Sequence, residues 1–320
     1  MKKLLGIVVF LLILYGALLF ADPGARSAGN HYNLGERIGL NGILTLGAGL
    51  LIITGGLDLS LGSVVGLCAT TLAVLLVDEN WPPLLAMAAV LILGASIGLF
   101  NGLLVTRLGL QPFVVTLCGL FMFRSAARWV AGGKPKGLGT QFVEWKQLLA
   151  GSFLGLPIPL LILMFLAGIA ILFLHFSVYG RYFYALGSNE RAARYSGIAT
   201  DRYRLMAYVL CSTLGAFFSI LLLMKYNTAT PSTTGEFYEL YAIAGAVLGG
   251  CSLRGGEGTV PGILIGTSIL VILPNLTTMR GVPNTLNNFV IGGALLLGAI
   301  LDEVLRSKGA VGRMGRGKSL

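Results

Sequence analysis

Few side chains in this chain have the types and spacing that catalysis or metal binding requires. The histidines, His31 and His175, stand alone near the ends of apolar runs, where solvated or interfacial positions are expected. The four cysteines lie in or beside apolar runs without C-x-x-C spacing, which disfavours metal and disulfide roles. No Ser/His, Asp/Asp or His-Glu-x-x-His arrangement occurs within those runs. We therefore expect no catalytic residue, no metal site and no cofactor.

One motif near the C-terminus has the spacing of a phosphate-binding loop. Residues Gly312–Ser319 satisfy the pattern G-x-x-x-x-G-K-[ST]. That chemistry needs a strand before the loop and a helix after it, because the helix N-terminus contacts the phosphates. Only Leu320 follows the motif, so we expect the match to be accidental. Residues 306–320 are expected to form a basic cytoplasmic tail on anionic lipid instead.

An isolated acid, Asp58, interrupts a long apolar region just after a glycine pair. It is the only acid between Arg37 and Asp78. A carboxylate at mid-membrane costs about 2.5–3.5 kcal/mol on insertion scales, which usually marks a functional position. The helix that follows also needs an N-cap, which Asp58 or Ser60 would supply without touching a solute. Capping is the favoured interpretation, and a place on a translocation path stays open.

The composition places these residues in a membrane. Hydrophobic residues make up 55% of the chain and charged residues 11%, and the mean hydropathy is +0.84; soluble domains carry about 25% charged residues. The formal net charge of +10 does not indicate nucleic-acid binding, because the basic residues fall in short loops between apolar runs. The predicted fold class is all-α, a polytopic bundle of about ten membrane helices. The candidate spans are Leu4–Phe20, Ile38–Ile53, Leu61–Val77, Leu84–Val105, Pro112–Ala131, Leu156–Leu174, Leu205–Met224, Phe237–Gly250, Thr259–Leu273 and Leu286–Leu301.

The distribution of Lys and Arg predicts the orientation of this bundle. When the spans alternate from an inside N-terminus, the inside segments hold about twice as many basic residues as the outside segments. Both termini are therefore predicted to be cytoplasmic. The first run could be a secretory signal peptide, but residues 20–23 make a poor cleavage site, and a retained helix is favoured. The span Phe237–Gly250 is short enough to be a half-span or re-entrant element, which protein would have to cover.

Glycine spacing predicts close helix packing. Gly94, Gly98 and Gly102 form consecutive G-x-x-x-G steps, which favour contact within one subunit over a dimer seam. The glycine pattern of residues 55–62 recurs at residues 249–256. Chance similarity remains an alternative for this second pattern, because the chain contains 46 glycines.

Two segments are expected at the outer surface of the membrane. Arg124 and Arg128 are four residues apart and share one face of the fifth span. We expect both to extend toward the headgroups beside Trp129, and the alternative is that they line a polar path. Residues Gln141–Ala150 place their apolar side chains on one face and predict an interfacial helix.

The largest inside loop, residues 176–204, contains a short helix with clear boundaries. Asn189 is a favourable N-cap, and Glu190 places negative charge in the first turn. Arg194 lies near the end, and Gly197 suits the left-handed position that terminates a helix. About two turns of helix are marginal alone in water, so docking against a partner would order it best. A helix lying at the interface is an equal alternative.

Four motifs resemble those of bacterial ABC-type monosaccharide importer permeases, the group serving ribose, xylose, galactofuranose and autoinducer-2. In chain order they are Gly55–Ser63, Asn101–Leu104 with Pro112–Leu117, Tyr184–Ile198, and Gly249–Thr259. The resemblance runs from about residue 35 to residue 300. It departs at Ser188, where the family usually has Gly, and at Tyr241, where the family tends to show an acid.

The resemblance implies a role for the third motif, and four polar residues are separate candidates for the translocation path. The motif would be a coupling helix that enters a groove on an ATP-binding subunit. The implied coupling residues are Gly187, Ser188, Asn189, Glu190, Arg191, Ala192, Ala193, Arg194, Gly197 and Ile198. The candidate residues for the translocation path are Asp58, Ser60, Asn101 and Glu239.

These inferences predict a multi-pass permease of the bacterial inner membrane, with a transmembrane domain over residues 1–305. Its partners would be ATP-binding cassette subunits, a second permease that is identical or related, membrane lipid, and a periplasmic or lipid-anchored solute-binding protein. The solute would be monosaccharide-like. The alternative is a secondary transporter without an ATPase, for which paired membrane carboxylates or matching broken helices would be expected.

Overall fold

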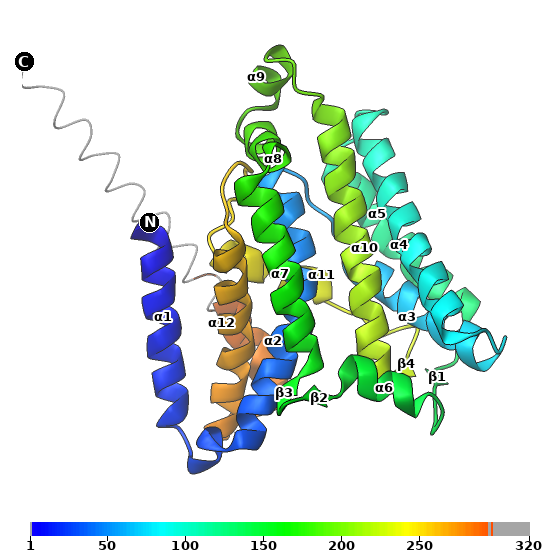
Figure 1. The fold of residues 1–320 in the computed structure, drawn as a ribbon, viewed down its shortest axis with the longest axis vertical. Helices are drawn as coiled ribbons and strands as arrows, with labels where there is room; N and C mark the ends of the chain where they lie inside the picture. The colour runs from blue at the N-terminus through cyan, green and yellow to red at the C-terminus, as the bar shows by residue number, and fades with distance from the viewer. Residues whose placement is uncertain (1, 294–295, 297–320) are drawn as a thin grey trace, which may run out of the picture.

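The computed structural model describes residues 2–293 and residue 296, and these form one helical bundle (Figure 1). The elements are α1 Lys2–Leu19, η1 Pro23–Arg26, α2 Ala28–Ile53, α3 Leu61–Val77, α4 Pro83–Thr106, α5 Pro112–Val130, β1 Lys136–Gly137, α6 Val143–Ala150, β2 Ser152–Phe153, β3 Leu156–Pro157, α7 Ile158–Phe176, α8 Val178–Ser188, α9 Glu190–Tyr195, α10 Thr200–Tyr226, β4 Thr228–Ala229, α11 Tyr238–Leu248, α12 Val260–Met279 and η2 Asn284–Leu286. Among them α2, α4, α5, α7, α10 and α12 are long and apolar enough to cross a membrane. The predicted all-α polytopic bundle is confirmed.

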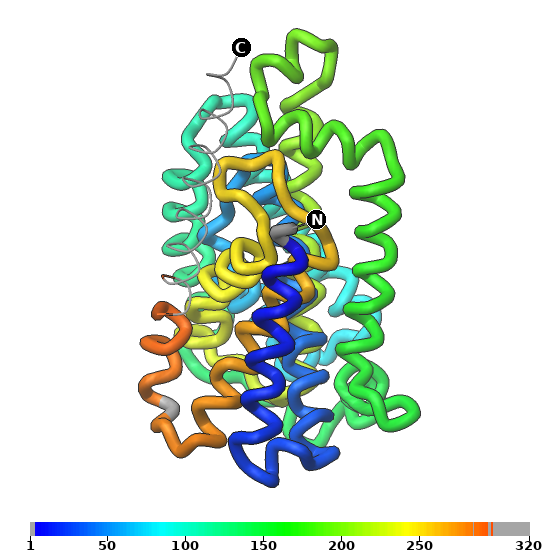
Figure 2. Tube along the Cα trace, turned by 90° about the vertical axis from the view of Figure 1, so that its left-hand side faces the viewer, coloured from blue at the N-terminus to red at the C-terminus, as the bar shows by residue number. Residues whose placement is uncertain are grey.

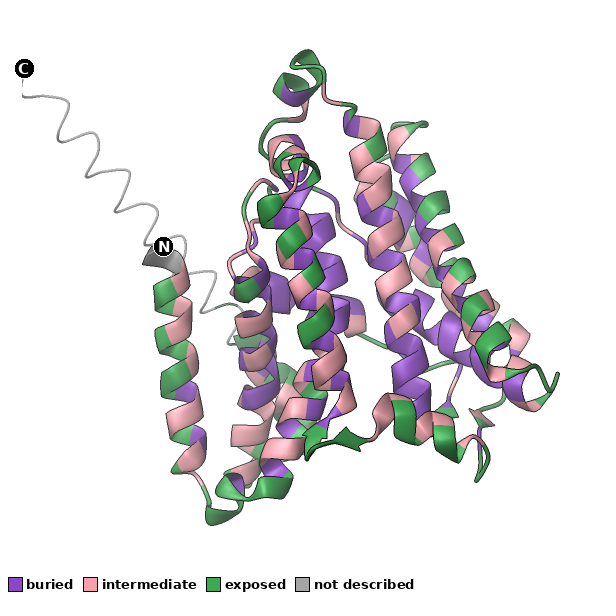
Figure 3. Ribbon diagram, viewed as in Figure 1, coloured by how far each residue is buried: buried purple, intermediate pink, exposed green. Residues whose placement is uncertain are grey.

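Helix α2 lies at the centre of the bundle. Its most apolar stretch is 83% buried, and α7, α10, α11 and α12 pack around it. Figure 3 shows the buried residues concentrated in the middle helices, α2, α3 and α10. The Ser27 hydroxyl accepts the Asn30 N–H at 3.2 Å and so caps the start of α2. Helix α1 lies outside this core and packs against α12 (Figure 2).

The glycine stripe of α4 packs against α10 of the same chain, as predicted. A Cβ atom at Gly98 would lie 2.6 Å from the Tyr208 carbonyl oxygen, and one at Gly102 would lie 2.6 Å from the Leu205 side chain. Real Cβ atoms essentially never come within 3.0 Å of such neighbours. The two helices therefore approach at a distance that only glycine permits.

The short predicted span Phe237–Gly250 is a half-span. Helix α11 has 11 residues, so it rises only about 16 Å, roughly half of a ~30 Å hydrocarbon core. The chain reaches its start through residues 230–237, where Gly235 packs against the Gly62 backbone of α3. Helix α3 thus covers the irregular backbone of this segment, since backbone polar groups at this depth cannot be left facing lipid.

Several span boundaries differ from the predictions, mostly at polar ends that cap or extend a helix. Helix α2 begins at Ala28 instead of Ile38, α10 at Thr200 instead of Leu205, and α12 runs to Met279 instead of Leu273. Helix α7 begins at Ile158, because residues 156–157 pair with residues 152–153 as a β-hairpin. A helix is present where the interfacial helix Gln141–Ala150 was predicted, as α6 Val143–Ala150, and its place at the membrane interface stays a prediction. Of the predicted span Leu286–Leu301, Leu286 ends η2 and residues 287–293 and 296 are helical. Residues 294–295 and 297–301 and the tail 306–320 lie outside the described residues.

The loops predicted to lie inside meet at one end of the bundle, called here the α9 end, and those predicted outside meet at the α6 end (Figure 1). At the α9 end, Gly55 packs beside Gly187 and the Arg254 carbonyl. At the α6 end, Lys136 forms an ion pair of 2.5 Å with Asp78, and β1 pairs with β4. The alternation of spans is consistent with this arrangement, and the end that faces the cytoplasm stays a prediction.

Candidate functional site

Helix α9 has the boundaries that its capping residues predict. The Asn189 side-chain oxygen accepts the Ala192 N–H at 3.0 Å, as an N-cap does. Gly197 has φ +83°, and the Ile198 N–H donates to the carbonyl five residues before it at 3.1 Å. This is the 6→1 hydrogen bond of a Schellman terminus. The helix itself, Glu190–Tyr195, has six residues.

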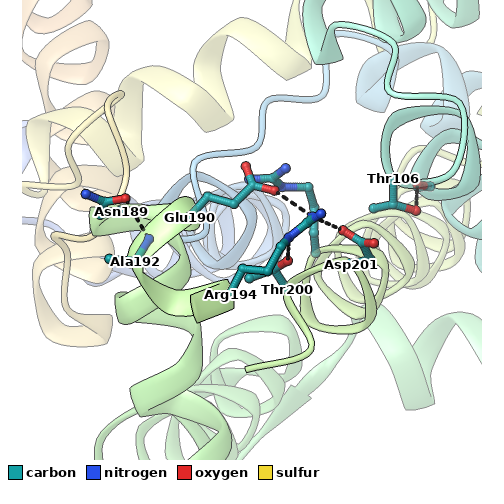
Figure 4. Close-up of polar contacts among 9 residues, drawn as sticks. Thr106, Asn189, Glu190, Ala192, Arg194, Thr200 and Asp201 are labelled. Atoms are coloured by element: carbon teal, nitrogen blue, oxygen red, sulfur yellow. Dashed lines mark hydrogen bonds and ion pairs between the residues drawn. The ribbon is translucent and has the colours of Figure 1, made fainter. Parts of the chain in front are cut away.

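A cluster of charges joins α9 to the first turns of α10 (Figure 4). The Arg194 guanidinium lies 2.7 Å from an Asp201 oxygen and 3.4 Å from a Glu190 oxygen, and it donates to the Thr200 hydroxyl at 3.2 Å. The other Glu190 oxygen lies 2.9 Å from Arg204. Exposed pairs of this kind contribute about 0–1 kcal/mol each. Glu190 and Arg194 therefore orient α9, with their charges satisfied inside the chain.

The outer face of α9 is open. Tyr195 is 92% exposed, and Ala193 is the buried residue of this helix. Beside helix α9 lies a groove of about 540 Å³ whose walls include Arg107, Ile198 and Arg202. We call Tyr195 with these three groove residues the docking surface. An exposed aromatic side chain next to arginines is typical of the residues that anchor protein interfaces.

Behind the docking surface, helix α8 ends in a contact between backbones. A Cβ atom at Gly187 would overlap the Ile53 carbonyl at the end of α2 and the Gly256 nitrogen in the loop before α12. The Gly256 N–H in turn donates to the Ile53 carbonyl at 2.9 Å. A Cβ at Gly255 would lie 2.7 Å from the Gly187 carbonyl and 2.9 Å from the Gly55 Cα. We call Gly55, Gly187, Gly255 and Gly256 the glycine junction.

The two glycine patterns noted in the sequence, residues 55–62 and 249–256, thus meet at this junction. A second contact reinforces it, since the Tyr184 hydroxyl of α8 donates to the Gly258 carbonyl at 2.7 Å. Burial raises the pKa of Tyr184 to about 12, so the hydroxyl keeps its proton and stays a donor at neutral pH. Helix α8 is therefore fixed to α2 and to the loop before α12.

Three of the four predicted translocation-path residues form one buried network. Asp58 Oδ1 accepts the Ser60 backbone N–H at 2.8 Å and the Ser60 hydroxyl at 2.5 Å, and Asn101 of α4 donates to the Ser60 hydroxyl at 3.1 Å. The capping prediction is wrong for both residues, because Ser60 stands at the N-cap of α3 and no side chain caps the helix there. Asp58 lies two residues earlier and orders the turn before α3 through its two bonds to Ser60.

The fourth residue, Glu239, lies apart from that network at the start of α11. It is 6% exposed, and its carboxylate contacts the Gly62 position of α3. Arg124 lies near it and donates to the Thr234 carbonyl at 2.5 Å and to the Gly62 carbonyl at 3.4 Å. The prediction that Arg124 extends toward the headgroups is wrong, because backbone carbonyls of the 230–237 segment bind its guanidinium. Arg128 is exposed.

Sequence reasoning did not single out three residues whose importance depends on contacts or exposure in the folded chain. Tyr184, Tyr195 and Arg204 all fall in or near the predicted coupling loop, yet only their contacts and exposure distinguish them. Helix α8 was also missed, and it packs against α7, α10 and α2. Within the described residues, no group of three or more His, Cys, Asp or Glu could hold a metal ion.

The fold and the site define a multi-pass helical membrane protein with a short capped helix fixed to its core helices at one end. The chain belongs to the family described as branched-chain amino acid transport system / permease component, which matches residues 36–299. The expected multi-pass inner-membrane location agrees with this family and with the apolar helices.

Relatives with assigned names cover most of the chain. It is 36% identical over 296 residues to the ribose import permease protein of Bacillus subtilis (strain 168), covering 92% of this chain and 90% of that protein. It is 35% identical to the ribose import permease protein of Escherichia coli (strain K12), with 92% of each chain covered. It is 32% identical to an autoinducer 2 import system permease protein of Klebsiella pneumoniae, covering 82% of this chain and 80% of that protein. No solved structure matches the chain.

Proposed function

We propose that this chain is the membrane-spanning subunit of an ATP-driven importer for a sugar or sugar-like solute, in which partner subunits hydrolyse the ATP. The fixed connection from α9 to α2 and α12 through the glycine junction is the observation that carries the proposal. The names of the relatives, ribose and autoinducer 2 import permeases, support the solute class. The predicted orientation puts the α9 end in the cytoplasm, where ATP is available.

The geometry suggests how movement of an ATPase would reach the membrane helices. The docking surface would bind the ATPase, with Tyr195 as the anchor in a groove of that partner. Helix α8 contacts α2 and the loop before α12 through backbone atoms, which cannot change rotamer to absorb a displacement. Movement of α9 would therefore shift the ends of two core helices, as expected for packed elements with discrete arrangements.

The complete importer would contain further subunits. A second permease, identical or related, would complete the translocation path, and a periplasmic or lipid-anchored binding protein would deliver the solute to the α6 end. Asp58, Ser60, Asn101 and Glu239 remain candidates for that path. A secondary transporter would instead move solute without an ATPase, and uptake by the purified chain alone would favour it.

Replacing Tyr195 with alanine tests the docking surface. Loss of an exposed aromatic anchor typically costs an interface 2 kcal/mol or more, so we expect binding of the ATPase subunit to weaken by about thirtyfold. Co-purification of the two subunits and ATP-dependent uptake into proteoliposomes are the measurements. Phe153→Ala is the matched control, because Phe153 is 60% exposed at the opposite end. Wild-type binding and uptake by the Tyr195→Ala variant would contradict the proposed docking.

A further inference from the structure

A cavity of about 220 Å³ lies between α2, α10, α11, α12 and Ile291 in the α6 half of the bundle. Its walls include Arg37 near the start of α2, Tyr226 at the end of α10 and Tyr238 at the start of α11. At about 30 Å³ per water this space would hold roughly seven waters. That volume suits a single five- or six-carbon solute. None of the four predicted path residues lines it.

One wall of the cavity is a polar stripe on α2. Arg37, Asn41 and Thr45 are four residues apart, so they share one face of the helix, and all three line the cavity. The Thr45 hydroxyl donates to the Asn41 carbonyl at 2.8 Å. No hydrogen bond or ion pair joins the Asn41 amide or the Arg37 guanidinium to any other part of the described chain. Polar side chains within a membrane helix are costly and usually mark the route of a solute.

The opposite wall is aromatic. Phe218 and Tyr238 meet edge to face with ring centroids 5.6 Å apart, and Tyr238 and Tyr241 do so at 6.4 Å. The Tyr241 hydroxyl donates to Asn288 at 2.6 Å, which orients its ring. Aromatic rings offer an apolar face to the C–H groups of a solute while a tyrosine hydroxyl remains available for hydrogen bonds.

The lining residues include one charged group, the Arg37 cation, and no carboxylate. A guanidinium donates five N–H bonds and binds hydroxyl or carboxylate oxygens, but it repels a cation. The combination of a donor-rich stripe, aromatic rings and a positive rim therefore fits a polyhydroxylated solute that is neutral or carries one negative charge. An amino sugar with a protonated amine does not fit.

We propose that this cavity is a solute site within the permease itself, for one monosaccharide-sized polyhydroxylated compound without positive charge. The inference rests on the proposed function for its solute class but not on ATP coupling. Asn41 and Arg37 bind hydroxyl or acid oxygens, and the Tyr238 and Tyr241 rings contact the carbon skeleton. The solute reaches the site from the α6 end before the bundle opens toward the α9 end.

Direct binding to the purified permease, without ATPase or ATP, tests the site. The probes are radiolabelled D-ribose, D-galactose, D-galacturonate and D-glucosamine, each at millimolar concentration and pH 7. We expect saturable binding of at least one of the first three probes and none of D-glucosamine. Asn41→Leu keeps the side-chain size while removing the amide, and it should weaken binding at least about tenfold.

Asn33→Leu is the control, since Asn33 is exposed on the same helix and does not line the cavity. It should bind the probes like the wild type, and size-exclusion profiles should show that both variants fold. The site is overturned if none of the first three probes binds saturably, if D-glucosamine binds as well, or if Asn41→Leu binds like Asn33→Leu. Failure of the ATPase to bind the docking surface would leave this binding unchanged, so the two proposals fail separately.

Discussion

Replacing Gly187 with alanine adds one methyl group at the most crowded point of the glycine junction. The new Cβ would overlap the Ile53 carbonyl and the Gly256 nitrogen, and both are backbone atoms that cannot move aside by changing rotamer. Overpacking by a methyl group costs about 1–3 kcal/mol. Separating the two backbones would also break the 2.9 Å hydrogen bond from Gly256 to Ile53, which contributes about 0.5–1.5 kcal/mol.

The two effects together amount to about 1.5–4.5 kcal/mol against the closed junction. Since each 1.4 kcal/mol changes an equilibrium tenfold, the population with α8 seated against α2 should fall by about tenfold or more. ATP-dependent solute uptake should then fall at least about tenfold in proteoliposomes that contain the ATPase partner. The docking surface is untouched, so the ATPase should still co-purify with the variant.

Gly168→Ala is the matched control, because no heavy atom lies within 4 Å of a Cβ built at Gly168 in α7. Alanine favours a helix by up to about 1 kcal/mol over glycine, so this variant should fold and transport like the wild type. The reasoning is refuted if Gly187→Ala purifies as a stable protein and supports uptake within about twofold of the control.

Two further predictions concern local structure. Asn189→Ala removes the cap of α9, worth about 1 kcal/mol, so amide hydrogen exchange across residues 190–196 should quicken about fivefold, whereas Asn189→Ser should preserve protection; equal exchange in both variants would contradict the capping role. Asp58→Ala removes the acceptor for two buried hydrogen bonds and should destabilise the chain by about 1–3 kcal/mol in thermal unfolding in detergent. Asp78→Ala, which breaks only the exposed pair with Lys136, should cost less than about 1 kcal/mol, and equal losses would show that the Asp58 network is not structural.

Features that depend on neighbours in sequence could be predicted well. The boundaries of α9 follow from Asn189 and Gly197, because a cap and a left-handed terminus act on backbone groups a few residues away. The G-x-x-x-G stripe on α4 was likewise assigned to packing inside the chain, since its spacing alone makes a flat helix face. Hydropathy located the spans because lipid imposes the same requirement on every crossing segment.

Features that depend on distant residues could not be predicted. Arg124 was expected among lipid headgroups. The sequence alone does not show that residues 230–237 fold back beside α3, where backbone carbonyls accept hydrogen bonds from the Arg124 guanidinium. The segment that forms the half-span α11 was recognised as short from its length. Only the fold shows that α3 covers the irregular backbone leading into it. The α2 stripe of Arg37, Asn41 and Thr45 is visible as a spacing of four, yet nothing in that spacing places aromatic rings opposite it.

By itself, the sequence determined that the chain is a helical membrane protein with a short capped helix between its sixth and seventh predicted spans, and its motifs resembled those of permeases. Hydrophobic runs, charge bias and capping residues act locally, so they can be recognised without knowing what lies beside them. Only the tertiary structure decided that Gly55, Gly187 and Gly256 meet, because contacts between backbones depend on the paths of three separate helices and not on side-chain type. The same reason applies to the cavity beside α2, whose walls come from α2, α10, α11, α12 and Ile291, which only packing brings together.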